Sequence, residues 1–82
     1  MEQQSPRAIA EIAREIKREW KKPNYAAEPY LNAMCQIYKI TDRYGVEDAR
    51  GIVAYFLANC GTFKGEAARR LKDELRTLAA AK

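Results

Sequence analysis

The hydrophobic positions divide the chain into four segments, and the first fits an amphipathic helix. Its apolar residues recur at spacings of three and four and form a narrow stripe: Ile9, Ile12, Ala13, Ile16 and Trp20. Ser5 followed by Pro6 is typical of a helix start, with serine as the N-cap. Pro23 cannot continue the pattern. The spacing therefore predicts a helix over residues 6–21.

The second segment has a wider apolar arc. Tyr30, Leu31, Met34, Ile37 and Tyr38 lie on two neighbouring stripes, so this helix should contact more than one partner. Pro29 fits the first turn of a helix. Gly45 is expected to be its left-handed C-terminal cap, which predicts a helix over residues 29–44.

The third segment, Ile52–Ala58, is a run of seven consecutive apolar residues. Such a run could be a buried strand on pattern alone, but no second strand candidate is present for it to pair with. Asp48 fits an N-cap and Gly61 a C-cap, which favours a helix over residues 48–60. Gly51 is expected to allow the close approach of another helix.

The fourth segment predicts a helix over residues 63–80, with Thr62 as the N-cap. Its apolar stripe is Ala67, Ala68, Leu71, Leu75 and Leu78. The fold class is therefore all-α: a compact bundle of four short helices in one domain over residues 1–82. Residues 1–4 and 80–82 are expected to fray. We expect the second and third helices to form an inner hairpin, with the first and last outside it.

The composition argues against catalysis. The chain has 82 residues, no histidine and two cysteines, so the commonest general base and metal ligand are missing. In an antiparallel hairpin, Cys35 and Cys60 would be offset by about 4.5 Å along the axis, which favours two free thiols. We expect no enzyme activity, no metal and no cofactor. The apolar run is shorter than the roughly 20 residues that span a bilayer, and no leader pattern is present. A cytoplasmic protein without membrane contact is expected.

The net charge of +4 comes from the two ends of the chain. If the first and last helices lie side by side, their basic residues could bind nucleic acid: Arg14, Lys17, Arg18, Arg69, Arg70, Lys72 and Arg76. Acidic residues interleave with them, however, including the pairs Glu15–Arg18 and Asp73–Arg76. Such mixed charge is more typical of a solvated surface.

A corner between the first two helices is the other candidate site. Trp20, Lys21, Lys22 and Tyr25 place aromatic residues beside basic ones, which is a composition that protein-binding hot spots favour. Alternatively, Trp20 closes the end of the bundle.

Several segments resemble small uncharacterised proteins carried by bacteriophages and integrative mobile elements of bacteria. They are Pro29–Met34, Tyr44-Gly45, Ile52–Asn59 and Phe63–Leu75. The resemblance implies an accessory gene product, and no catalytic residues. Such proteins often inhibit host defence, as anti-CRISPR proteins do, or help to control element DNA. The first expectation is a non-catalytic module that binds a host protein or protein–nucleic acid complex. A small basic nucleic-acid-binding protein is the alternative, and a structural homodimer is the third.

Overall fold

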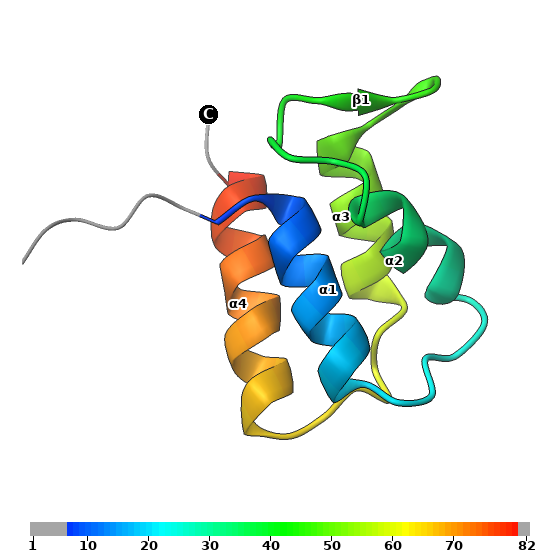
Figure 1. Ribbon diagram of the computed structural model, residues 1–82, viewed down its shortest axis with the longest axis vertical. Helices are drawn as coiled ribbons and strands as arrows, with labels where there is room; N and C mark the ends of the chain where they lie inside the picture. The colour runs from blue at the N-terminus through cyan, green and yellow to red at the C-terminus, as the bar shows by residue number, and fades with distance from the viewer. Residues whose placement is uncertain (1–6, 81–82) are drawn as a thin grey trace, which may run out of the picture.

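The computed structural model describes residues 7–80, which form an all-α fold with a two-stranded hairpin (Figure 1). The helices are α1 (Ile9–Glu19), α2 (Glu28–Met34), α3 (Ala49–Ala58) and α4 (Glu66–Ala80). The strands are β1 (Arg43–Tyr44) and β2 (Glu47–Asp48). The predicted all-α bundle of four helices is confirmed.

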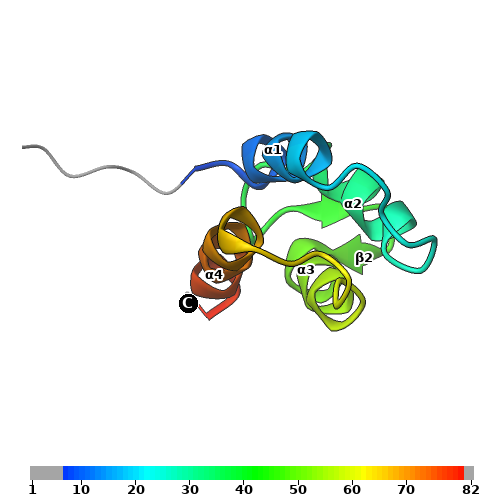
Figure 2. The same ribbon diagram turned by 90° about the horizontal axis from the view of Figure 1, so that it is seen from below.

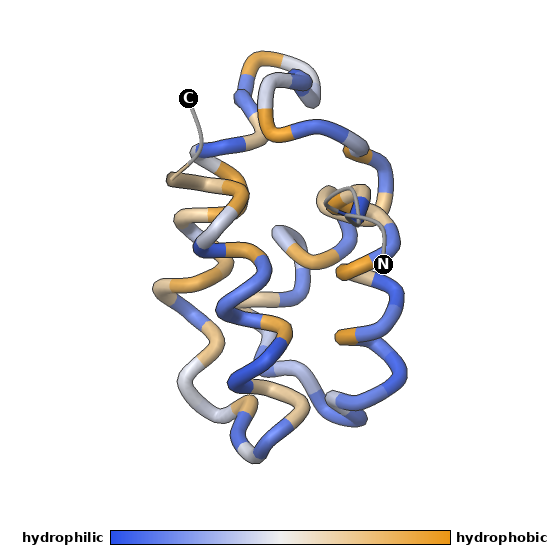
Figure 3. Tube along the Cα trace, turned by 90° about the vertical axis from the view of Figure 1, so that its left-hand side faces the viewer, coloured by the Kyte–Doolittle hydropathy of each residue, from blue (hydrophilic) through white to orange (hydrophobic). Residues whose placement is uncertain are grey.

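The helices form a ring of four in which each packs on two neighbours. Helix α1 contacts α2 and α4, while α3 contacts the same two helices (Figure 2). Helices α2 and α3 pack on each other as expected, but they are not an inner pair, because α1 and α4 also pack on each other and complete the ring. The stripe of α1 explains the difference, because its apolar residues are as deeply buried as those of α3. In Figure 3, hydrophobic and hydrophilic positions alternate along the helical turns, because each helix buries one face against its neighbours.

Helix α1 is shorter than predicted. It begins at Ile9, with Ala8 as its N-cap, and the predicted start at Ser5-Pro6 lies outside the described residues. The backbone N–H of Ile9 donates to the carbonyl of Tyr38 at 3.0 Å, so the segment after α2 satisfies one free donor of the first turn. The helix ends where the Trp20 N–H donates to the Ile16 carbonyl at 2.7 Å.

The largest correction concerns the second helix, which stops at Met34 and not at residue 44. The Asp42 carboxylate accepts hydrogen bonds from the backbone N–H groups of Tyr38, at 3.1 Å, and Lys39, at 3.0 Å. A side chain that bonds to nearby backbone in this way competes with helical hydrogen bonding. Ile37 is buried beyond the helix end, so the chain keeps its apolar contact while it turns.

Gly45 belongs to the hairpin and does not cap a helix. Strands β1 and β2 pair antiparallel, with Tyr44 opposite Glu47, so Gly45 and Val46 form a two-residue turn. Gly45 has a φ of 66° and no described non-glycine residue has a positive φ, which fits a type II′ turn. The sequence did not predict this hairpin, but its strands pair only with each other, and the apolar run Ile52–Ala58 lies in a helix as expected.

Asp48 is the N-cap of α3, as predicted, and its carboxylate accepts the Gly51 N–H at 2.8 Å. The reason for Gly51 is different from the one expected. A Cβ at this position would lie 2.9 Å from Asp48 Oδ1, so the glycine makes room for the capping carboxylate and not for another helix. At the other end Asn59 is the C-cap, and Gly61 does not have a positive φ.

The fourth helix begins at Glu66, three residues later than predicted, and its described part extends to Ala80. Phe63 lies in the preceding loop and is buried in the core. Thr62 is not an N-cap; its hydroxyl donates to the Asn24 side-chain oxygen at 3.5 Å. Gly65, with a φ of 108°, connects the loop to the helix. Both cysteines are free, and Cys60 is buried.

Candidate binding surfaces

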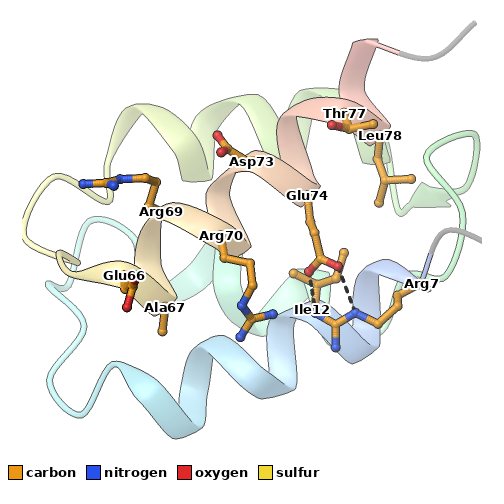
Figure 4. Close-up of a pocket in the computed structure, with 10 residues that line it drawn as sticks. All are labelled: Arg7, Ile12, Glu66, Ala67, Arg69, Arg70, Asp73, Glu74, Thr77 and Leu78. Atoms are coloured by element: carbon orange, nitrogen blue, oxygen red, sulfur yellow. Dashed lines mark hydrogen bonds and ion pairs between the residues drawn. The ribbon is translucent and has the colours of Figure 1, made fainter.

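Four ionised side chains link α1 to α4. Arg7 forms an ion pair with Glu74 (Figure 4) and a second one with Glu15 at 2.9 Å. Arg70 pairs with the same Glu15 at 2.6 Å. We call this set the charged seam. It replaces the predicted Glu15–Arg18 pair, because Glu15 reaches across to α4.

The charges of the seam stabilise one another. Hydrogen bonds from Arg70, which has the larger effect, and from Arg7 hold the pKa of the Glu15 carboxyl below its usual range. The hydrogen bond with Glu74 raises the pKa of Arg7. An open groove of about 910 Å³ runs along the seam, lined also by Ile12 and Leu78 (Figure 4). Its charged groups are largely compensated by one another, which is more typical of a structural contact than of a site awaiting a ligand.

The basic residues predicted to bind nucleic acid do not form one surface across α1 and α4. Arg14, Lys17 and Arg18 are exposed on α1. Between them and the basic residues of α4 lies the charged seam, in which Arg70 is paired. Of the remaining basic residues of α4, Arg69 also borders the groove beside the seam, whereas Lys72 and Arg76 do not.

These residues surround a second, smaller hollow of about 340 Å³ beside the first turn of α4. Its basic lining residues are Lys64, Arg69, Lys72 and Arg76. Lys72 donates to the Phe63 carbonyl at 2.7 Å and lies 5.8 Å from the centroid of the Phe63 ring. Arg76 pairs with Asp73 at 3.1 Å, as the sequence predicted. We call these four residues the basic edge. Lys64 was not among the predicted site residues, although it lay within the helix predicted over residues 63–80; in the structure it precedes α4.

Cys60 lies under this edge. Burial raises the pKa of its thiol, and the nearby positive charges of Lys72 and Arg76 act in the opposite direction. Its Sγ donates to the Leu57 carbonyl at 3.4 Å. The thiol therefore has the character of a structural cysteine.

The structure corrects the expectation that Trp20 is exposed to a partner. Its side chain is only 7% exposed. The indole stacks on Phe63, with the ring centroids 5.0 Å apart, and meets Phe56 edge-on at 6.2 Å. Trp20 therefore closes the end of the bundle, which is the alternative that the sequence left open. Its predicted companions Lys21, Lys22 and Tyr25 are exposed, and Tyr25 is 87% exposed.

Exposed aromatic residues concentrate in one half of the chain. The exposed large hydrophobic residues of the described chain lie between the α1–α2 connection and α3: Tyr25, Tyr38, Tyr44, Val46 and Tyr55. Tyr55 also stacks on Tyr30 of α2, with the ring centroids 5.4 Å apart. We call Tyr30, Tyr38, Tyr44, Val46 and Tyr55 the tyrosine set. The sequence placed Tyr38 on the apolar arc of the second helix and Tyr55 in the apolar run, yet both side chains are exposed.

Within residues 7–80, no group of three or more His, Cys, Asp or Glu side chains is arranged to hold a metal ion. None of the helices in this range is long and apolar enough to cross a membrane. Comparisons with protein-family models, with curated proteins and with solved structures give no match to the chain.

Proposed function

We propose that this protein is a non-catalytic binding protein that acts by contacting another protein through the tyrosine set. The observation that carries the proposal is that the exposed large hydrophobic residues of the described chain all lie between residues 25 and 55. Tyrosine is enriched among the residues that dominate protein–protein binding energy. It offers a large contact area at a small cost in conformational entropy, because only two side-chain torsions become fixed.

Local contacts support this role for the tyrosine set. The stack with Tyr30 limits the movement of the Tyr55 ring, which is still 54% exposed. Val46 occupies the tip of a tight hairpin and is 89% exposed. An apolar residue held at a turn tip and an aromatic ring fixed on a helix are features that reduce the entropy lost on binding.

The resemblance to proteins of phages and mobile elements suggests the kind of partner. We propose that the protein acts in the bacterial cytoplasm and inhibits a host defence complex of the CRISPR type. Its positive net charge argues against DNA mimicry, since a mimic of DNA would need an acidic surface. A homodimer formed through the same tyrosine set is the competing proposal.

Affinity purification with paired variants tests the main proposal. Tagged wild-type protein would be used to isolate a partner from a bacterial host, and the purified partner would then be titrated against variants. Tyr55→Ser with Val46→Ser should weaken binding at least about 30-fold, as expected when about 2 kcal/mol of contact energy is lost. Arg14→Ser with Lys17→Ser, which changes two exposed residues of α1, should leave the affinity within about threefold.

Two results would contradict the proposal. Undiminished binding by the Tyr55→Ser/Val46→Ser variant would show that the partner uses another surface. Light scattering that finds a dimer, which the same variant converts to a monomer, would favour the homodimer instead.

A further inference from the structure

The segment from Ala49 to Gly65, which comprises α3 and the α3–α4 loop, contains no acidic residue. Its ionisable cations are Arg50 and Lys64. Every other helix of the described chain contains at least one glutamate. The part of the surface that borders α3 and this loop therefore lacks the interleaved acids that compensate charge on α1.

The basic edge of α4 faces this acid-free segment. Arg69, Lys72 and Arg76 are spaced by three and four residues and therefore lie on one side of the helix. Arg70 and Glu74 lie on the other side, toward α1; Figure 4 shows the Arg70 side chain pointing to α1 and the Arg69 side chain pointing away from it. The two flanks of α4 thus differ in charge: one is paired and the other is basic.

Two acidic residues of α4, Asp73 and Glu66, lie close to the four basic residues of the edge in sequence, and they lower its positive charge without cancelling it. Asp73 pairs with Arg76 and removes one positive charge. Glu66 borders the groove of the charged seam together with Arg7, Arg69 and Arg70. Lys64 and Arg69 are exposed, and Lys72 is held in place by the Phe63 carbonyl and ring. The edge therefore keeps a positive potential that a polyanion can use.

We propose that the basic edge, formed by Lys64, Arg69, Lys72 and Arg76, binds the phosphate backbone of double-stranded nucleic acid. From Arg69 to Arg76 the edge extends about 10.5 Å along α4, at 1.5 Å per residue. A duplex strand carries one phosphate per roughly 3.4 Å of helix axis, so the edge can face about three phosphates. The hollow between these side chains opens beside Gly65, at the start of α4, where free backbone N–H groups favour anions.

A duplex fits the edge better than a single strand or a lipid surface does. Binding of single strands relies on exposed aromatic rings that stack on bases, but Phe63 is buried beneath Lys72. Membrane binding relies on exposed apolar residues that enter the lipid. In the described chain, the exposed large hydrophobic residues belong to residues 25–55 and not to this edge. Contact would be with the backbone, and so independent of sequence.

Fluorescence anisotropy with a labelled 20-base-pair DNA duplex tests the proposal. For the wild-type protein, the logarithm of the binding constant should fall with the logarithm of the KCl concentration, between about 50 and 200 mM, with a slope of about −3. Lys64→Glu with Arg69→Glu should weaken binding at least tenfold and reduce the magnitude of the slope by about 2. Arg14→Glu with Lys17→Glu is the matched control, because it changes the net charge equally on α1. The control should retain affinity within about threefold.

The outcomes separate this site from its alternatives. No binding by the wild-type protein at about 50 mM salt overturns the proposal. Equal losses of duplex affinity in the two charge-reversal variants would mean that binding depends only on net charge, and would also overturn the proposal. Tighter binding to a single strand, to vesicles containing phosphatidylserine or to polyglutamate would assign the edge to a different polyanion. The Tyr55→Ser/Val46→Ser variant should bind the duplex normally, so this proposal and the protein-binding function can fail separately. Circular dichroism checks that every variant is folded.

Discussion

The α1–α4 pair and the α2–α3 pair cover the same core with different surfaces. Helices α1 and α4 have 11 and 15 residues and are linked by the charged seam. Helices α2 and α3 have 7 and 10 residues, and the exposed tyrosines lie on α3 and in the segments before and after α2. The longer pair compensates its charges internally, whereas the shorter pair leaves aromatic rings in water.

The shorter pair also depends more on side chains that bond to backbone. Asp42 holds the turn after α2, and Asp48 caps α3. A helix of 7 residues is not stable by itself in water, so its ends must be held by tertiary contacts. Similar burial is therefore reached by ion pairs between long helices or by turns and caps around short ones. Only the second arrangement leaves large apolar side chains available to a partner.

The largest expected effect comes from the residue that joins the two regions. Trp20 follows α1 and packs on Phe56 of α3 and on Phe63 of the loop before α4. Trp20→Ala should lower the free energy of unfolding by about 3–5 kcal/mol, because it leaves a cavity between both pairs. For a chain of this length the total is roughly 4–12 kcal/mol, so the variant should be near unfolding at room temperature.

Urea denaturation followed by circular dichroism measures this effect. Tyr55→Ala is the matched aromatic variant on the exposed surface, and it should cost no more than about 1.5 kcal/mol, the value of its stack with Tyr30. Equal losses in the two variants would mean that the tyrosine set is as structural as the core, and would remove the contrast between the regions.

The second prediction concerns the cap of α3 in the shorter pair. Asp48→Ala should destabilise the protein by about 1 kcal/mol, because the Gly51 N–H loses its acceptor. Gly51→Ala alone should change stability little: the gain in helix propensity of about 1 kcal/mol is offset when the new Cβ displaces the capping carboxylate. In the Asp48→Ala background, the same Gly51→Ala change should stabilise by about 1 kcal/mol.

A double-mutant cycle measured by urea denaturation tests this coupling between the two positions. If Gly51→Ala has the same effect in both backgrounds, the glycine is not required by the cap, and the approach of another element would have to explain it. Substitutions in α1 should show no such coupling with Asp48.

The sequence predicts the stripes of buried residues better than it predicts where helices end. Periodic apolar positions located α1, α2 and α4, because burial of one face follows directly from spacing, whereas α3 was located from its capping residue Asp48 and the lack of a strand partner. The end of α2 was missed since it depends on the Asp42 carboxylate, which competes with helical bonding through a contact that periodicity does not register. Because α2 ends at Met34, Gly45 lies in the turn of the β1–β2 hairpin and not at a helix end.

The candidate surfaces were predictable only in part. The basic character of α4 can be read from the chain, but its division into two flanks depends on Glu15 reaching across from α1 to Arg70. Trp20 and Tyr25 illustrate the same limit, because both flank one basic corner and only Tyr25 is exposed. Exposure at a corner depends on which loop covers it, and here the loop containing Phe63 covers the indole.

The smallest expected effect tests the charged seam of the longer pair. Glu15→Gln should lower the free energy of unfolding by no more than about 1 kcal/mol at pH 7 and low salt, since the contacts involve partly exposed side chains. Arg7 keeps its partner Glu74 in this variant. Glu11→Gln removes the same charge one turn earlier on α1, and should stay within about 0.5 kcal/mol of the wild type.

The contribution of the charged seam to the free energy of unfolding should depend on pH. Because hydrogen bonds from Arg70 and Arg7 lower the pKa of Glu15 in the folded state, its contribution is present above the ordinary glutamate value of about 4.3. It should be lost as the pH falls from about 5 through the lowered folded-state pKa. The difference between wild type and Glu15→Gln, followed by urea denaturation from pH 7 to pH 3, should therefore shrink at the acid end, and it should also shrink in about 1 M salt. A difference in unfolding free energy that persists unchanged under both conditions would show that Glu15 acts through packing. The α1–α4 pair would then not depend on ion pairs, and the contrast with the α2–α3 pair would be weaker.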